Sequence, residues 1–90
     1  MKKMTKYRSN GIRVIKFNIG DNNYDKTMVF YKSGKPKQEK NYKNGNLEGN
    51  IISYWENGKI HTKGKYKKNH RTGLWETFDK KGKLVFSEEY

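Results

Sequence analysis

The sequence predicts an all-β fold, a single-layer antiparallel meander of repeated β-hairpins with a period of 24 residues. Gly34, Gly58 and Gly82 carry this period, because each lies 24 residues after the one before. Further columns follow the same step: Phe30, Tyr54 and Phe78; Tyr42, Tyr66 and Tyr90; Gly49 and Gly73. No stretch shows sustained helical periodicity. In such an array each unit stacks only on its neighbours, so we expect a thin core.

Turn residues place the strands of the repeats. Glycine or asparagine recurs at residues 34, 45, 58, 69 and 82, at alternating intervals of 11 and 13 residues. Two turns in each unit leave room for two strands of about six to eight residues, so the unit is a hairpin. The expected strands are residues 36–42, 48–55, 60–66, 73–79 and 83–89.

The N-terminal third contains a degenerate copy of the unit. Residues 12–18 and 27–31 are rich in β-branched and aromatic residues and predict strands, and a short strand at 3–8 precedes them. Asn10-Gly11 predicts a hairpin turn, and residues 21–23 a loop. We expect one domain over residues 1–90, with a degenerate unit at about 5–30, units at 31–54 and 55–78, and a partial unit at 79–90.

Composition predicts a basic protein with little apolar material. The 90 residues carry a net charge of +12, and only 16 of them are Phe, Leu, Ile or Val, a balance found in disordered chains. Seven Tyr, two Trp and the regular repeat favour a folded chain instead. The absence of cysteine excludes disulfides and thiolate zinc sites.

The start of the chain predicts a cytoplasmic protein. Met1-Lys2-Lys3 resembles the start of a signal peptide, but polar residues follow where an apolar segment is required. No apolar run approaches the length needed to span a bilayer.

Residues 60–66 show the alternation of a half-exposed strand. Ile60, Thr62, Gly64 and Tyr66 share one parity, whereas His61, Lys63 and Lys65 share the other. We therefore expect His61 to be solvated beside the two lysines, and His70 to lie in a turn. In the next strand Trp75 aligns with Ile51 at the 24-residue step, and Leu74 and Phe78 complete its apolar set, so Trp75 is expected in the core.

A basic run without acidic residues is the main candidate binding site. It consists of Lys59, Lys63, Lys65, Lys67, Lys68 and Arg71. One interpretation is that the lysines keep exposed strands soluble. The other is that they bind phosphate, acidic lipid or an acidic protein. The candidate aromatic contact residues are Tyr42, Tyr66 and Trp55.

Catalytic, cofactor and metal sites are not predicted. His61 and His70 have no cysteine and few carboxylates at metal-ligand spacing. Glu88 and Glu89 are neighbours in a strand, so they point to opposite faces and do not form an acid/base pair. The glycines open hairpins and match no phosphate-binding fingerprint.

Several short motifs resemble the variant MORN repeat. They are Tyr54-Trp-Glu-Asn-Gly58-Lys-Ile60, Gly64-Lys-Tyr66, Gly73-Leu-Trp75 and Phe78, and the likeness covers about residues 28–90. The pattern is similar to the bacterial YwqK-like family, whose members are classed as antitoxins. Departures from it are Lys40 and Ile51, where the family has glycine and tryptophan, and Lys81-Gly82 and Asn69-His70, where it has asparagine-glycine. The resemblance implies a MORN-like array of hairpins that acts as a binding platform.

Resemblance and charge together predict a non-enzymatic interaction module from a bacterium or phage. The leading hypothesis is an antitoxin, immunity or inhibitor protein that binds an acidic surface of a toxin or effector. The alternatives are a nucleic-acid-binding protein, with lysines on the backbone and aromatic rings on bases, and attachment to an anionic membrane surface. Self-association through sheet edges is a further possibility.

Overall fold

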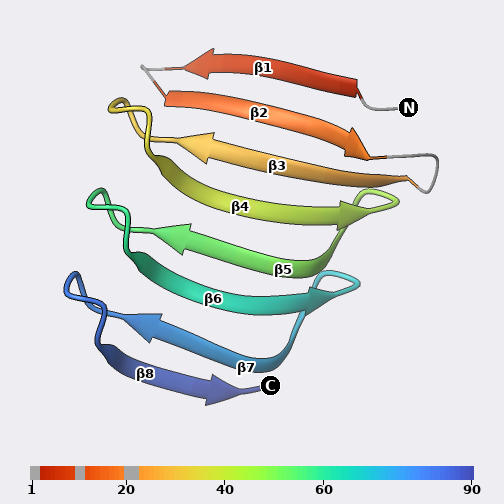
Figure 1. Cartoon of the computed structure of the whole chain (residues 1–90). Coiled ribbons are helices and arrows are strands. Elements are labelled where there is room, and N and C mark those ends of the chain that lie inside the picture. The colour runs from red at the N-terminus through yellow and green to blue at the C-terminus, as the bar shows by residue number, and fades with distance from the viewer. Residues whose placement is uncertain (1–2, 10–11, 20–22) are drawn as a thin grey trace.

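The computed structural model of the protein describes residues 3–9, 12–19 and 23–90. They form one open eight-stranded antiparallel sheet in which each strand pairs with the next along the chain (Figure 1). The strands are β1 (Lys3–Ser9), β2 (Ile12–Ile19), β3 (Tyr24–Phe30), β4 (Pro36–Lys43), β5 (Asn46–Tyr54), β6 (Ile60–Lys67), β7 (His70–Phe78) and β8 (Leu84–Glu89). The predicted all-β meander is confirmed.

The sheet is a single layer, with principal extents of 39 × 32 × 18 Å. Within the described ranges, no helix is long and apolar enough to cross a membrane. The predicted turn at 10–11, and residues 21 and 22 of the predicted loop, lie outside the described residues.

Three turns with the same hydrogen bonds lie at one end of the strands (Figure 1). They comprise residues 31–35, 55–59 and 79–83. In each, the first residue's N–H donates to the last residue's carbonyl at 2.8 Å, and the glycine N–H donates to the first residue's carbonyl at 2.9–3.0 Å. Gly34, Gly58 and Gly82 have φ values of 94°, 90° and 91°, a region that favours glycine. This requirement explains the 24-residue glycine column.

Two-residue turns lie at the opposite end of the strands. Asn44-Gly45 and Lys68-Asn69 have positive φ at all four residues, as type I′ hairpin turns require. Asn69 therefore occupies the glycine position, and His70 is the first residue of β7, paired with Lys67. The expectations that His70 lies in the turn and that Asn69-His70 replaces asparagine-glycine were wrong, because asparagine itself tolerates the left-handed conformation.

Strands β5 and β7 begin earlier than predicted, directly after the two-residue turns, and each contains a bulge. Between the pairs Lys40↔Ile51 and Tyr42↔Leu47, three residues of β5 lie opposite Asn41. The corresponding shift in β7 lies opposite Gly64, and the bulge glycines, Gly49 and Gly73, have φ values of 91° and 69°. The Asn41 side-chain amide donates to the Asn50 carbonyl at 2.8 Å, which satisfies a polar group at the bulge.

Trp75 is the buried hydrophobic residue of the described chain, with 8% of its surface exposed. Its ring packs edge-to-face against Tyr66, at 5.1 Å between centroids, and against Tyr90 at 6.1 Å. The indole N–H donates to the Lys65 carbonyl at 3.1 Å. The predicted core position of Trp75 is confirmed. Leu74, expected in the same apolar set, is 52% exposed, because neighbours in a strand point to opposite faces.

Side chains at the turns hydrogen-bond from one unit to the next. The Tyr31 hydroxyl donates to the Tyr54 carbonyl at 2.6 Å, and the Trp55 indole N–H donates to the Phe78 carbonyl at 3.0 Å. The next position at the 24-residue step is Asp79, whose carboxylate instead accepts the backbone N–H groups of its own turn, from Lys81 and Lys83, both at 2.9 Å.

These bonds predict an acid-sensitive turn. The N–H of Lys83, more than that of Lys81, holds the pKa of Asp79 below its ordinary value. A lowered folded pKa stabilises the protein above the unfolded pKa, and this contribution is lost as the pH falls through the folded pKa. Asp79→Asn keeps an acceptor oxygen without titrating, so between about pH 5 and pH 2 its melting temperature should fall less than that of the parent. Equal losses in both proteins would contradict this role.

Candidate functional site

Strand β6 presents a row of exposed lysines on one face of the sheet. Lys63, Lys65 and Lys67 alternate with half-buried Gly64 and Tyr66, so their side chains share a face. The Lys63 ammonium lies 3.7 Å from a Glu76 carboxylate oxygen and 5.8 Å from the centre of the Phe78 ring. The predicted division between Lys63 and Lys65 on one face and Tyr66 on the other agrees with this register.

A hollow of about 320 Å³ at the two-residue turns extends this row. It is lined by Lys43, Asn44, Asn46, Glu48, Lys67 and Lys68. The backbone N–H of Lys68 donates to the Glu48 carboxylate at 3.1 Å, which ties the turn to β5. We call Lys43, Lys63, Lys65, Lys67 and Lys68 together the lysine surface. Sequence reasoning missed Lys43, although the 24-residue step from Lys67 could have found it.

His61 lies away from the lysine surface, which corrects the expectation that it is solvated beside Lys63. The register shifts between Ser53 and Tyr54, and this irregularity reverses the alternation at His61. Its Nδ1 is 3.0 Å from the Thr62 hydroxyl and 3.4 Å from the Ser53 hydroxyl. The ring is half-buried and meets the Trp55 ring edge-on at 4.3 Å.

Arg71 lies on the face opposite the lysine row. It pairs with Tyr66, and its guanidinium lies 4.7 Å from the Trp75 ring centre and 5.4 Å from that of Tyr90. The guanidinium donates to the Tyr90 hydroxyl at 2.8 Å, and that hydroxyl donates to Glu88 at 2.5 Å. The bond to Tyr90 is the main cause that raises the pKa of Arg71 above its ordinary value. The residues of the predicted basic run therefore lie on both faces of the sheet.

The remaining predicted site residues lie in other places. Lys59 is in the five-residue turn at the far end of β6, where its side chain lies 3.8 Å from the position a Cβ would take on Gly82. Trp55 joins two units through its hydrogen bond to Phe78, and the Lys80 ammonium lies 5.4 Å from the centre of its ring. Tyr42 shares the face of Tyr66 but belongs to the preceding unit.

The carboxylates and histidines of the described residues do not gather into a metal site. Among residues 3–9, 12–19 and 23–90, no group of three or more His, Cys, Asp or Glu could hold a metal ion. Glu88 pairs with Trp75 and Glu89 with Leu74, which confirms that the two glutamates point to opposite faces. The candidate sites are therefore surfaces that could bind a partner.

Comparison with known families agrees with the repeat and the turns. The sequence model of the MORN repeat variant matches residues 26–44, 47–68 and 71–90, together more than half of the chain. The chain belongs to the MORN repeat variant family. Each matched MORN segment contains one five-residue turn and most of both strands that flank it. MORN repeats are generally non-catalytic modules that bind proteins or membranes. No curated protein and no solved structure matches the chain.

Proposed function

We propose that this MORN repeat protein is a cytoplasmic, non-catalytic module that binds an acidic surface of a partner protein. The lysine surface is the observation that carries the proposal, because it presents exposed ammonium groups on one face and around one hollow. A toxin or effector is the partner we infer, which would make the protein an antitoxin, immunity or inhibitor protein. The similarity of its motifs to the YwqK-like family supports this assignment.

The arrangement of charges favours a protein over a nucleic acid. Stacking of bases beside phosphate contacts needs aromatic rings next to the cations. Here the predicted stacking residues Tyr66 and Trp75 lie on the face opposite Lys63 and Lys65. The ring beside Lys63 belongs to half-buried Phe78, so bases would find little exposed aromatic surface along this row. Glu76 also lies within the lysine surface, where a polyanion would meet it. The separate carboxylates of a protein partner can be placed between such charges.

Reversing three charges tests the surface. The triple substitution Lys63→Glu, Lys65→Glu and Lys68→Glu should leave folding nearly unchanged, because exposed charges contribute within about 0.5 kcal/mol each. Binding to immobilised poly-glutamate, an acidic protein surrogate, should weaken mainly through slower association, and the loss should shrink as salt rises. Surface plasmon resonance at low and moderate salt measures both effects.

The matched control reverses Lys32, Lys35 and Lys81, which are exposed in the five-residue turns and change the net charge equally. It should retain more binding than the first variant. An equal loss of binding in both variants would show that net charge alone determines the affinity for poly-glutamate. Tighter binding to duplex DNA or to phosphatidylserine vesicles than to poly-glutamate would instead favour a nucleic acid or a membrane.

The antitoxin assignment has a test of its own. We expect the protein to co-purify with the product of a neighbouring gene when the two are co-expressed, and the lysine-surface variant to lose that complex. If no neighbouring product binds, the antitoxin assignment fails, whereas binding to the acidic surrogate still decides the broader proposal.

A further inference from the structure

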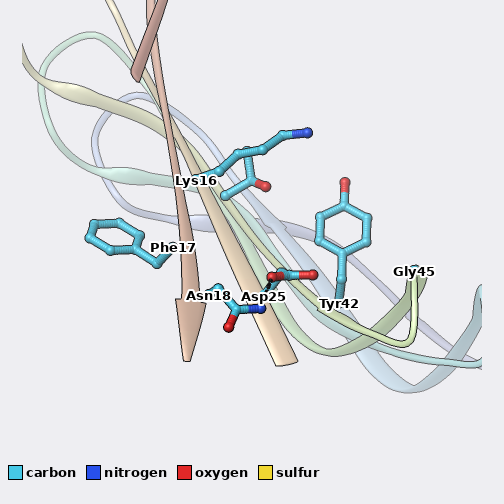
Figure 2. A pocket seen from close by; sticks show the side chains of 7 residues that line it. Lys16, Phe17, Asn18, Asp25, Tyr42 and Gly45 are labelled. Atoms are coloured by element: carbon cyan, nitrogen blue, oxygen red, sulfur yellow. Dashed lines mark hydrogen bonds between the residues drawn. The ribbon is translucent and has the colours of Figure 1, made fainter. Parts of the chain in front are cut away.

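A second hollow, of about 510 Å³, lies across β2, β3 and β4 on the face that carries Tyr42 and Tyr66. It is lined by Lys16, Phe17, Asn18, Asp25, Thr27, Tyr42 and Gly45, and we call it the N-terminal hollow. Asn18 pairs with Asp25, and Asp25 with Tyr42, so these three side chains share a face. Figure 2 shows Lys16 and Tyr42 extending to one side of β2, and Phe17 to the other. Its volume is within the range of about 300–1,000 Å³ of ligand pockets.

The repeat explains why this hollow is unfilled. Thr27 lies two periods, 48 residues, before Trp75, and Lys16 lies 48 before Gly64. In the C-terminal unit the indole of Trp75 covers Gly64 and fills the space between strands. In the N-terminal unit a threonine occupies the tryptophan position, so no ring from the side chains that the structure describes takes the place of the indole.

Two further residues of the C-terminal core, Tyr66 and Gly73, also have polar counterparts in the N-terminal unit. Asn18 corresponds to Tyr66, and Asp25 to Gly73, whose positive φ makes the bulge in β7. The β2–β3 pairing is regular, without a register shift, so Asp25 and Thr27 project from an ordinary strand. All four repeat positions that build the packed core near the C-terminus therefore carry hydrogen-bonding side chains here.

The hollow combines donors and acceptors of both charges. The Asn18 amide donates to Asp25 Oδ1 at 2.8 Å, which uses one of the several acceptor positions of this carboxylate. Asn18, Asp25, Thr27 and Tyr42 are half-buried, whereas Lys16 is exposed. The Tyr42 ring forms an apolar wall beside these polar groups (Figure 2).

These groups restrict the chemistry of a ligand. A phosphate or other dianion would meet the carboxylate of Asp25. An organic cation would meet Lys16 on a protein of net charge +12. An apolar molecule would desolvate Asp25 and Thr27 without replacing their hydrogen bonds to water. Hydroxyl groups avoid all three costs, because each can donate to Asp25 and accept from Lys16, Thr27 or Tyr42.

We propose that the N-terminal hollow binds a neutral, hydroxyl-rich ligand of the size of a mono- or disaccharide. This site is separate from the lysine surface, since it lies on the other face of the sheet. It does not rest on the proposed binding of an acidic protein.

The test is an amide-resolved NMR titration of the whole protein with glucose, galactose, mannose, maltose and cellobiose, each to about 50 mM, a range suited to weak binding at about millimolar Kd. At least one sugar should cause saturable shifts at residues 16–18, 25–27 and 42. Asp25→Asn, which keeps the side-chain shape, should weaken binding about tenfold or more, because a hydrogen bond to a charged group is lost. Thr27→Val should also weaken it. Glu76→Gln, on the other face, should bind as the parent does.

Three results would overturn the proposal. One is no shift at these amides with any of the sugars. Another is unchanged sugar affinity in both Asp25→Asn and Thr27→Val, provided that their amide spectra remain those of the folded protein. The third is saturable shifts at the same amides with inorganic phosphate or arginine and none with the sugars.

Discussion

Replacing Trp75 by alanine is expected to lower the free energy of unfolding by about 3–5 kcal/mol, the usual cost of removing a large buried ring. The indole is 8% exposed, packs against the rings of Tyr66 and Tyr90, and donates its N–H to the Lys65 carbonyl. Trp75 is the buried hydrophobic side chain among those that the structure describes, so its neighbours in a single-layer sheet cannot absorb the loss. Because small domains are stable by only about 5–15 kcal/mol, the variant should lose much of its stability.

Leu74→Ala is the matched control for this substitution. Leu74 precedes Trp75 in β7 but is 52% exposed on the opposite face, so its truncation should cost less than about 1 kcal/mol. Thermal and urea unfolding of both variants measure the difference. A Trp75→Ala protein that melts within a few degrees of the parent would contradict the core position and make Trp75 a candidate contact residue.

The spacing of glycines was sufficient to predict the strand order. Gly34, Gly58 and Gly82 recur because each five-residue turn needs a positive φ at the same place, and this local requirement is visible in the sequence. Hairpins between such turns pair with their neighbours, so the meander followed from the period. The position of Trp75 was predictable for a related reason, because large aromatic residues in a chain with little apolar material are the available core.

The bulges were not predictable from alternation. Gly49 and Gly73 shared the period, but the sequence did not indicate that their positive φ would occur inside a strand. At His61, an irregularity in the register moved the ring from the expected lysine face to the side of Ser53 and Thr62. Register depends on the partner strand, so a pattern within one strand cannot reveal such a reversal.

The candidate sites were predicted in part for the same reasons. Lys63 and Lys65 follow simple alternation and share a face as predicted, whereas Arg71 comes after a turn that places it against Tyr66 on the other face. The N-terminal hollow was missed because Thr27 and Asp25 look like ordinary polar strand residues. Only their alignment with Trp75 and Gly73 indicates that a packed position has become polar.

A second large effect is expected at Gly64, on which the Trp75 ring lies. A Cβ at this position would be 2.2 Å from the Cδ2 atom of Trp75, so Gly64→Ala must displace the ring. The φ of Gly64 is not in the positive region, so alanine meets no backbone penalty there. We expect a loss of about 1–3 kcal/mol, typical of overpacking, which arises from the clash alone.

The preceding unit suggests how the clash can be relieved. There Lys40 stands in the place of Gly64 and Ile51 in the place of Trp75, and these two residues pair directly. Because residue 51 carries no indole, no glycine is needed opposite it. In a Trp75→Ile background, Gly64→Ala should therefore cost close to nothing, which gives a coupling of about 1 kcal/mol or more between the two sites. Gly58→Ala is the control, because its φ of 90° imposes a backbone cost and no atom lies within 4 Å of its added Cβ. Urea unfolding of the full set measures the cycle. If Gly64→Ala lowers the free energy of unfolding equally with tryptophan and with isoleucine at residue 75, the penalty arises within β6 itself. Gly64 would then not be required to accommodate the Trp75 ring.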